Sequence, residues 1–173
     1  MATDSVVHQL AIRLGNGLRD ERLMLATAES CTGGRVATAM TDISGSSGWF
    51  ERGFVTYSNQ AKSEMIGVPA ELIDRHGAVS EQVARAMAEG ALRNSRAQVS
   101  LAITGVAGPG GGTETKPVGM VSFGWTNRLH TKVETLVFKG DRDRIRVQAA
   151  AHALRGVLLL LDEHLLFFGG GGH

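Results

Sequence analysis

The amino-acid sequence predicts a single three-layer α/β/α domain, in which helices cover both faces of a mixed, parallel and antiparallel, central sheet. Three observations lead to this fold class. Predicted strands and helices alternate along the 173 residues, and neither a repeat nor a Pro- or Ser-rich linker divides them. Short apolar runs bounded by glycine clusters are typical of buried strands. Near the C-terminus two alternating segments lie close together and predict an antiparallel hairpin.

The first third of the chain alternates helix and strand. Apolar residues that recur with helical spacing near the N-terminus predict an amphipathic helix, which Asp4 or Ser5 would cap. A short apolar run and a later segment rich in aromatic and β-branched residues each predict a strand. The elements expected in order are helix 5–20, strand 22–28, helix 34–42, loop 44–48 and strand 50–57.

The middle of the chain predicts three helices. Ser58 would cap the first, over 60–66, and Gly67 would end it, since glycine adopts the left-handed conformation that closes helices. Pro69 suits the first turn of the second helix. Ser80 starts a longer third helix with apolar side chains along one face, at Val83, Ala84, Met87 and Ala91.

The remainder of the chain predicts three more strands and a long helix. The apolar segment 99–104 predicts a buried strand, and a cluster of glycines follows it. Segments 118–126 and 132–138 alternate in polarity and predict the hairpin, so this part of the sheet should be antiparallel. The last helix is expected from Arg142 to about Leu161.

Composition narrows the classes of function. Lys plus Arg is 18 and Asp plus Glu is 17, and this balance argues against nucleic-acid binding. One cysteine cannot form an internal disulfide, which fits a reducing compartment. The N-terminus lacks a secretory signal, and the apolar run 157–161 is too short to cross a membrane, so a cytoplasmic protein is expected. The six histidines show no metal-ligand spacing, so no metal site is expected.

A hydroxyl and a thiol lie side by side at the first strand-to-helix turn, where Ser30 and Cys31 precede Gly33 and Gly34. Such a turn presents side chains at the end of a sheet, and a helix N-terminus offers backbone N–H groups to an anion. A nucleophile beside an oxyanion site is what acyl transfer requires. The same residues also fit a glycine-rich connection with small polar fillers, and the local sequence leaves both interpretations open.

Two features indicate a phosphate site. Five glycines within 105–112 would let backbone N–H groups approach an anion, although a flexible loop without a ligand is equally compatible. Arg142, Arg144 and Arg146 lie in the first turns of the last helix, where the helix dipole disfavours cations. Basic residues at this helix start are therefore expected if they bind an anion. Because acidic neighbours partly neutralise them, a salt-bridged surface remains the alternative.

Lys62 lies within the short helix 60–66. Most lysines are solvated surface residues, and without other information this one would be too. A partly buried lysine near other cations, however, loses its proton readily and can act as a base.

Six blocks of the sequence follow one another in a characteristic order. They are Ala28-Glu29-Ser30-Cys31-Thr32-Gly33-Gly34, Gly53-Phe54-Val55-Thr56-Tyr57-Ser58-Asn59 with Lys62, Gly77-Ala78-Val79-Ser80, Thr104-Gly105-Val106-Ala107-Gly108-Pro109-Gly110-Gly111, Lys116-Pro117-Val118-Gly119 and Gly140-Asp141-Arg142. Together they resemble the CinA C-terminal domain family over roughly residues 5–165, and the domain they predict spans 1–165. The tail 166–173 matches nothing in this pattern and is assigned no role.

The resemblance implies an enzyme of pyridine nucleotide salvage that hydrolyses the carboxamide of nicotinamide mononucleotide, giving nicotinic acid mononucleotide and ammonia. It also implies a serine–lysine pair, no metal or organic cofactor, and a homodimer or higher homo-oligomer. Longer members carry an additional N-terminal domain, for which 173 residues leave no room.

The resemblance further implies a role for individual residues. Ser30 is the nucleophile, Lys62 is the base, and Tyr57 orders the site or lies beside the pyridinium ring. The oxyanion and substrate would be held by Thr32, Gly33, Gly34 and Thr104. The phosphate would be held by Gly105, Gly108, Gly110, Gly111, Arg142 and Arg146.

Two other functions stay open at this point. A non-catalytic nucleotide- or phosphate-binding module would use the same glycines and arginines, with Ser30 as a phosphate ligand. A cysteine amidase using Cys31 is the weaker alternative, because no histidine is placed to serve it in the local sequence.

Overall fold

Five strands form one mixed sheet in the computed structural model, which describes residues 2–168. Their order across the sheet is β2-β1-β3-β4-β5. β1 pairs in parallel with β2 and β3, whereas β4 pairs antiparallel with β3 and β5. The strands are β1 (Leu25–Glu29), β2 (Phe50–Val55), β3 (Val99–Gly105), β4 (Met120–Thr126) and β5 (Thr131–Val137). The predicted mixed sheet with its C-terminal hairpin is confirmed.

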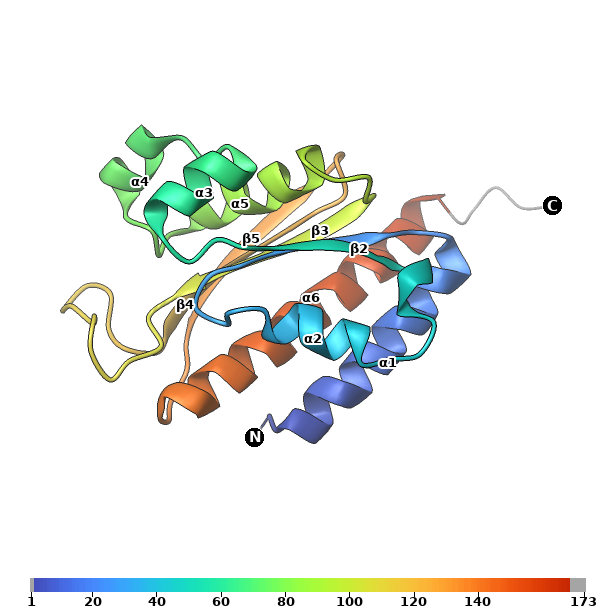
Figure 1. The fold of residues 1–173 in the computed structure, drawn as a ribbon, viewed down its shortest axis with the longest axis horizontal. Helices are drawn as coiled ribbons and strands as arrows, with labels where there is room; N and C mark the ends of the chain where they lie inside the picture. The colour runs from blue at the N-terminus through green and yellow to red at the C-terminus, as the bar shows by residue number, and fades with distance from the viewer. Residues whose placement is uncertain (1, 169–173) are drawn as a thin grey trace.

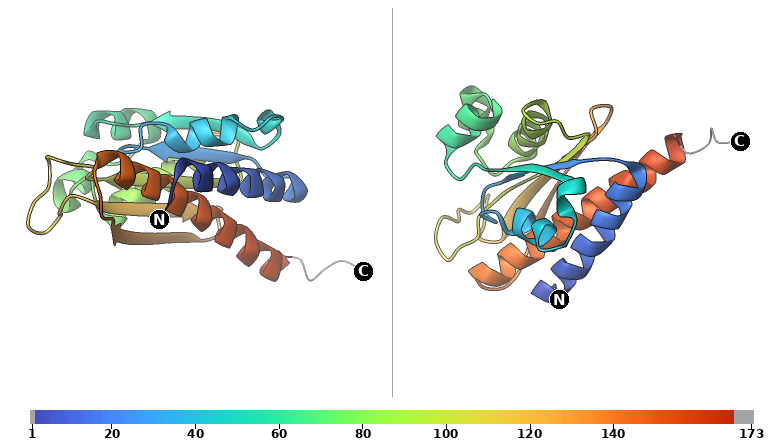
Figure 2. Two further views of the ribbon diagram at one scale, coloured as in Figure 1. Left: turned by 90° about the horizontal axis from the view of Figure 1, so that it is seen from below. Right: turned by 45° about the vertical axis from the view of Figure 1, so that its right-hand side comes forward.

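Helices cover both faces of this sheet (Figures 1 and 2). One layer consists of α1 (Asp4–Glu21), α2 (Arg35–Thr41) and α6 (Arg142–Phe168), which contact one another. The opposite layer consists of α3 (Asn59–Ile66), α4 (Ala70–His76) and α5 (Glu81–Arg93). The predicted three-layer α/β/α architecture is therefore confirmed.

The two largest apolar cores flank the sheet. The larger lies between the sheet and α1 and α6, where Leu14, Leu101 and Leu154 are fully buried. The smaller packs α5 against β1 and β3 through Met87 and Ala28. Full burial of a side chain of leucine size contributes about 1.5–3 kcal/mol relative to exposure, so these faces fix the helices to the sheet.

Several boundaries differ from the prediction for local reasons. Thr3, and neither Asp4 nor Ser5, caps α1, because its hydroxyl accepts a hydrogen bond from the Val6 N–H at 3.3 Å. The first strand begins at Leu25, since the preceding turn of chain is used to end α1. Three further differences are that the 44–48 loop contains a short 3₁₀ helix (Ser46–Gly48), that Pro69 caps α4 rather than lying in its first turn, and that α6 runs on to Phe168.

The predicted tail, 166–173, therefore begins inside α6. Its last part, 169–173, lies outside the described residues. Within the described chain, no helix is long and apolar enough to cross a membrane.

The carboxyl ends of β1, β2 and β3 meet at the same edge of the sheet, because these three strands are parallel. The connection from β1 to β2 passes through α2 on one face. The connection from β2 to β3 passes through α3, α4 and α5 on the other. Where successive connections leave a parallel sheet on opposite faces, a crevice opens beyond the strand ends, and ligands bind there.

Candidate active site

A pocket of about 270 Å³ lies at this edge of the sheet, beyond the ends of β1 and β3. Two of its lining side chains carry basic groups, and none is acidic. It therefore suits a small molecule with negative charge. The lining residues are Ser30, Cys31, Tyr57, Asn59, Lys62, Ala78, Val79, Thr104, Gly105, Ala107 and Arg142.

A larger groove of about 560 Å³ lies along α5 and is bordered by residues of the α3–α4 segment and by Val133 of β5. Its lining includes Arg85 and Glu89, which form an ion pair at 3.5 Å across one turn of α5. None of the residues predicted to react or to bind substrate lines this groove. Size alone does not identify the site, and the smaller pocket carries the reactive groups.

Ser30 follows the last residue of β1 and is 7% exposed. Its backbone N–H donates to the Ile103 carbonyl at 3.0 Å, so the β1–β3 ladder extends to Ser30. Successive residues of a strand point to opposite faces of the sheet. Accordingly, the Glu29 side chain is directed to α2, and the Ser30 side chain to α3.

Lys62 lies on α3 and is 1% exposed. Ser58 caps this helix, as predicted, by accepting a hydrogen bond from the Ala61 N–H. The Lys62 Nζ lies 3.2 Å from Ser30 Oγ and 3.4 Å from the Tyr57 carbonyl oxygen. Burial lowers the pKa of Lys62, and the nearby Cys31 opposes this only in part. A hydroxyl therefore meets an amine that deprotonates more easily than an ordinary lysine.

Cys31 lines the same pocket but has the opposite acid–base properties. Burial raises the pKa of the Cys31 thiol to about 12, although the nearby Arg146 and Lys62 act in the other direction. Only the thiolate is a good nucleophile, and at neutral pH this group is a thiol. The raised pKa of Cys31 thus favours Ser30 over the cysteine alternative.

Tyr57 and Arg142 form one rim of the pocket. The Arg142 Nη2 donates to the Tyr57 hydroxyl at 3.3 Å, and its Nη1 donates to the Gly108 carbonyl at 2.7 Å. Both acceptors are neutral oxygens, so the positive charge of Arg142 stays available to an anionic ligand. The Tyr57 side chain is 63% exposed.

Thr104 and the start of the glycine-rich segment form the wall that adjoins Arg142. The Thr104 hydroxyl donates to the Ala78 carbonyl at 2.9 Å and holds the α4–α5 connection against the end of β3. Gly108 has φ of 78°, and a side-chain carbon there would lie 2.4 Å from Val118, so only glycine fits. Gly105 lines the pocket, whereas Gly110 and Gly111 are exposed at the loop tip and do not.

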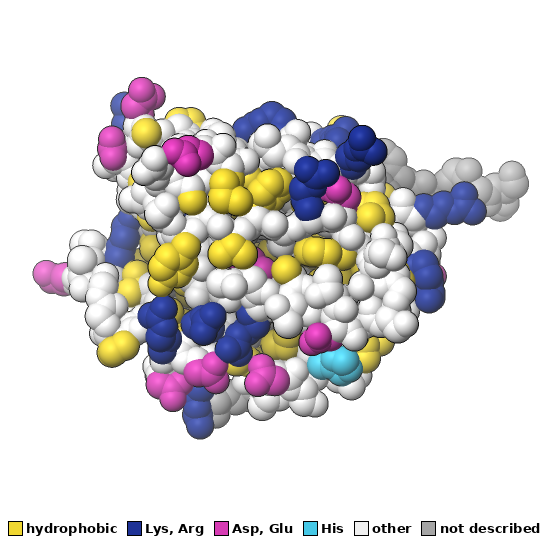
Figure 3. All heavy atoms as spheres, viewed as in Figure 1, with side chains coloured by type: hydrophobic (Ala, Val, Ile, Leu, Met, Phe, Trp, Pro, Cys, Tyr) yellow, Lys and Arg dark blue, Asp and Glu magenta, His cyan; other side chains and the backbone are white. Residues whose placement is uncertain are grey.

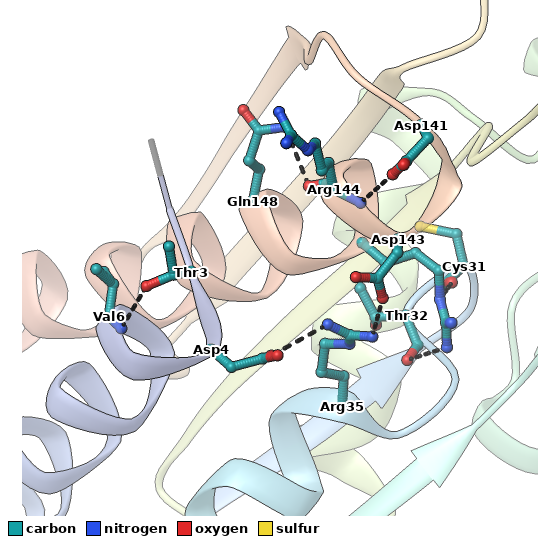
Figure 4. Close-up of polar contacts among 11 residues, drawn as sticks. Thr3, Asp4, Val6, Cys31, Thr32, Arg35, Asp141, Asp143, Arg144 and Gln148 are labelled. Carbon is teal, nitrogen blue, oxygen red and sulfur yellow. Dashed lines mark hydrogen bonds and ion pairs between the residues drawn. The ribbon is translucent and has the colours of Figure 1, made fainter.

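Arg146 lies away from the pocket and contacts the turn that carries Ser30. Its Nε donates to the Cys31 carbonyl at 3.0 Å and its Nη2 to the Thr32 carbonyl at 3.2 Å; the two acceptor residues are labelled in Figure 4. Nearby, Arg35 forms ion pairs with Asp4 and Asp143. In Figure 3 basic and acidic side chains gather together over the region where α6 begins. These contacts join α1, α2 and α6 beside the site.

Among the three backbone N–H groups expected at the oxyanion site, that of Gly33 has a partner within the turn. The Gly33 N–H donates to the Ser30 carbonyl, and the Arg35 N–H donates to the Thr32 carbonyl. The first N–H groups of α2 donate to the Glu29 carboxylate. Accordingly, Thr32, Gly33 and Gly34 do not line the pocket.

The sequence analysis did not predict that the Glu29 carboxylate accepts hydrogen bonds from the first N–H groups of α2. The available signal was the start of α2: Gly34 stands at its cap position and has no side chain to accept a hydrogen bond. A helix without a local cap needs an acceptor from elsewhere, and an acidic residue at the end of the preceding strand is a candidate.

The described residues contain no group of three or more His, Cys, Asp or Glu side chains that could hold a metal ion. The reactive features of the pocket are thus a buried hydroxyl next to a buried amine, and an arginine at the rim. That combination is suited to acyl transfer on a small anionic substrate.

Sequence comparison places residues 7–161 on the model of the CinA C-terminal domain. The chain is 53% identical over 154 residues to the nicotinamide-nucleotide amidohydrolase PncC of Escherichia coli (strain K12), covering 88% of this chain and 93% of that protein. It is also 53% identical over 161 residues to a putative competence-damage inducible protein of Symbiobacterium thermophilum, of which the match covers 38%.

Solved structures share the fold. The competence/damage inducible protein CihA from Agrobacterium tumefaciens superposes with a TM-score of 0.87 at 43% identity, over 91% of this chain and 96% of that one. A CinA superfamily protein from Escherichia coli also has a TM-score of 0.87, at 37% identity, over 92% of this chain and 94% of that one. Both comparisons agree with the resemblance inferred from the sequence blocks.

Proposed function

The chain belongs to the CinA C-terminal domain family, and we propose that it hydrolyses the carboxamide of nicotinamide mononucleotide, with Ser30 as nucleophile and Lys62 as its base. The observation that carries the proposal is the 3.2 Å separation of Ser30 Oγ and Lys62 Nζ inside the pocket. The name of its E. coli relative, a nicotinamide-nucleotide amidohydrolase, supports the substrate and the reaction.

In the first half of the reaction, neutral Lys62 takes the proton of the Ser30 hydroxyl while Ser30 Oγ attacks the carboxamide carbon. The carbonyl oxygen becomes the oxyanion of a tetrahedral intermediate. When this intermediate collapses, the C–N bond breaks, and protonated Lys62 gives its proton to the leaving nitrogen. Ammonia departs and leaves an ester between Ser30 and the nicotinoyl group.

In the second half, water replaces ammonia. Neutral Lys62 takes a proton from the water, whose oxygen attacks the ester carbon. The ester C–O bond breaks, Lys62 returns the proton to Ser30 Oγ, and nicotinic acid mononucleotide is released. The Lys62 amine thus accepts and donates the proton in every step, and the steps require no metal or organic cofactor.

Two features of the site support this use of a lysine. The Lys62 amine is buried, and burial disfavours its charged form. The Tyr57 carbonyl lies 3.4 Å from both Lys62 Nζ and Ser30 Oγ, where it can accept a hydrogen bond from either and align the pair.

The phosphate of the substrate is assigned to the rim of the pocket. Arg142 extends its guanidinium there beside Tyr57, and Gly105 and Ala107 form the adjoining wall. Guanidinium groups bind phosphate through charge-assisted hydrogen bonds. With the phosphate at Arg142, the base of the mononucleotide lies toward Ser30, next to the exposed face of Tyr57.

The reduced Cys31 suits a cytoplasmic enzyme, and we assign the protein to that compartment. We also propose a homodimer or higher homo-oligomer, as its family resemblance implies. Light scattering on the purified protein measures the subunit number directly.

The rival function is a non-catalytic module that binds the same nucleotide with Ser30 as a phosphate ligand. Release of ammonia from nicotinamide mononucleotide by the purified protein separates the two. Activity that is lost in Ser30→Ala supports the enzyme. Tight binding of the mononucleotide without any ammonia release would support the module.

A further inference from the structure

Glu29 is a buried carboxylate that the reaction described above does not use. It is 1% exposed, and within the described part of the chain no ion pair reaches it. An isolated buried charge is costly unless hydrogen bonds compensate it. The side chain accepts three: from the Thr32 hydroxyl at 2.7 Å, the Val36 N–H at 2.9 Å and the Ala37 N–H at 3.1 Å.

These three bonds span the turn that carries the nucleophile. Glu29 is the last residue of β1, Thr32 lies within the turn, and Val36 and Ala37 lie in the first turn of α2. One side chain therefore ties the strand that precedes Ser30 to the helix that follows it. Gly34 at the cap position offers no competing acceptor.

Arg146 completes the arrangement from the side of α6. It donates to the Cys31 and Thr32 carbonyls, whereas Glu29 accepts from donors of the same turn and of the start of α2. Arg146 thus binds backbone carbonyls, whereas Glu29 binds backbone N–H groups. Two glycines, Gly33 and Gly34, lie inside this segment. Glycine is the most flexible residue, so a turn built from it needs such external restraint to hold one geometry.

We propose that Glu29 is the positioning residue of the nucleophile: by fixing the turn between β1 and α2, it holds Ser30 Oγ within reach of Lys62. Glu29 lies on the α2 side of the sheet and does not line the pocket, so it acts only through Ser30. This inference rests on the serine mechanism proposed above.

Glu29→Gln is the sharpest test, because it keeps the size of the side chain. One amide oxygen can still accept from Thr32 and Val36, but the amide nitrogen then faces the Ala37 N–H, donor against donor. We expect kcat for ammonia release to fall on the order of tenfold to a hundredfold, since small misplacements of reacting groups cost that much. KM should change less than about twofold, because the substrate contacts remain.

A second measurement follows Ser30 without substrate. A small fluorophosphonate labels activated serines, and mass spectrometry gives its rate of reaction with Ser30. The labelling rate should fall in Glu29→Gln by the same factor as kcat. The matched control is Ser100→Ala, which removes a buried hydrogen bond to the Ala88 carbonyl at the far end of β3. It should lose stability but keep kcat and labelling.

Several outcomes would overturn the role of Glu29: an unchanged kcat in Glu29→Gln, a fall in kcat with an unchanged labelling rate, or an equal loss of kcat in Ser100→Ala. If Glu29→Gln does not fold, Thr32→Val decides in the same way, because it removes only the 2.7 Å bond to the hydroxyl. If Ser30→Ala still released ammonia, the serine mechanism itself would fail. The labelling rate of Ser30 would still show whether Glu29 holds it in place.

Discussion

Ser30 Oγ and Lys62 Nζ lie 3.2 Å apart although they belong to elements on different layers of the fold, one at the end of β1 and the other on α3. The parallel pairing of β1 with β2 produces this proximity, because it brings the ends of both strands to one edge of the sheet. α3 begins four residues after β2 ends, and Lys62 then lies in its first turns.

The nucleophile can be distinguished from its neighbour by substitution. Ser30→Ala should abolish ammonia release, while Cys31→Ala should keep most of it, because burial holds the cysteine as a thiol. Steady-state ammonia assays on both purified variants check this. An inactive Cys31→Ala together with an active Ser30→Ala would assign the reaction to the thiol instead.

Arg142 should contribute mainly to substrate binding. Arg142→Ala should weaken binding of the mononucleotide by about 1.5–3 kcal/mol, the cost of losing a charge-assisted contact, with a smaller effect on kcat. Titration calorimetry with the inactive Ser30→Ala background measures the dissociation constant. Arg155→Ala is the control, since it removes an exposed arginine from the same helix far from the pocket. Equal binding by both variants would place the phosphate elsewhere.

The rate of turnover should rise with pH. Only the neutral form of Lys62 can accept the proton of Ser30, and burial lowers the pKa of this amine, so the rising limb should lie below the ordinary lysine value of about 10.4.

Lys62→Arg keeps the charge but cannot deprotonate, so it should bind substrate without turning it over. Near wild-type ammonia release from Lys62→Arg would make the lysine a positioning charge and not the base.

Much of the fold was predictable because the sequence carries local signals for it. Caps such as Ser58 and Ser80, and the closing glycine Gly67, fixed helix ends to within a residue. The apolar face of α5 and the hairpin of β4 and β5 were also predicted from the sequence. The residue that caps α1 and the residue at which α6 ends were predicted wrongly. At each of these helix ends, several neighbouring residues are chemically suitable.

The site was only partly predictable. The proximity of Ser30 and Lys62 depends on strand order, which no local pattern encodes, and it was expected only through a family resemblance. Arg146 was expected at the phosphate because its position at a helix start suggested an anion. In the fold it lies beside backbone carbonyls of the turn instead. Long-range partners of a charged side chain are set by tertiary packing and cannot be assigned from spacing.

The buried charge of Lys62 should make the stability of the folded protein depend on pH. Because the pKa of Lys62 is lowered in the folded protein, the unfolded chain binds the proton more tightly than the folded one. Below the folded pKa, both states are protonated and the penalty for burying the charge is fully present. Between the folded and the unfolded pKa, the folded state alone is neutral, and stability should rise by about 1.4 kcal/mol per pH unit.

Lys62→Met keeps an unbranched side chain of similar length and removes the charge, so it should be more stable than the wild type at neutral pH. The difference should shrink as the pH rises toward 10.4, where the wild-type penalty disappears. Thermal unfolding of both proteins from pH 6 to pH 10 measures it. Lys139→Met, which changes an exposed lysine, should show no such convergence. If Lys62→Met were less stable than the wild type at neutral pH, the buried amine would be held by compensating contacts and not at a cost to the fold.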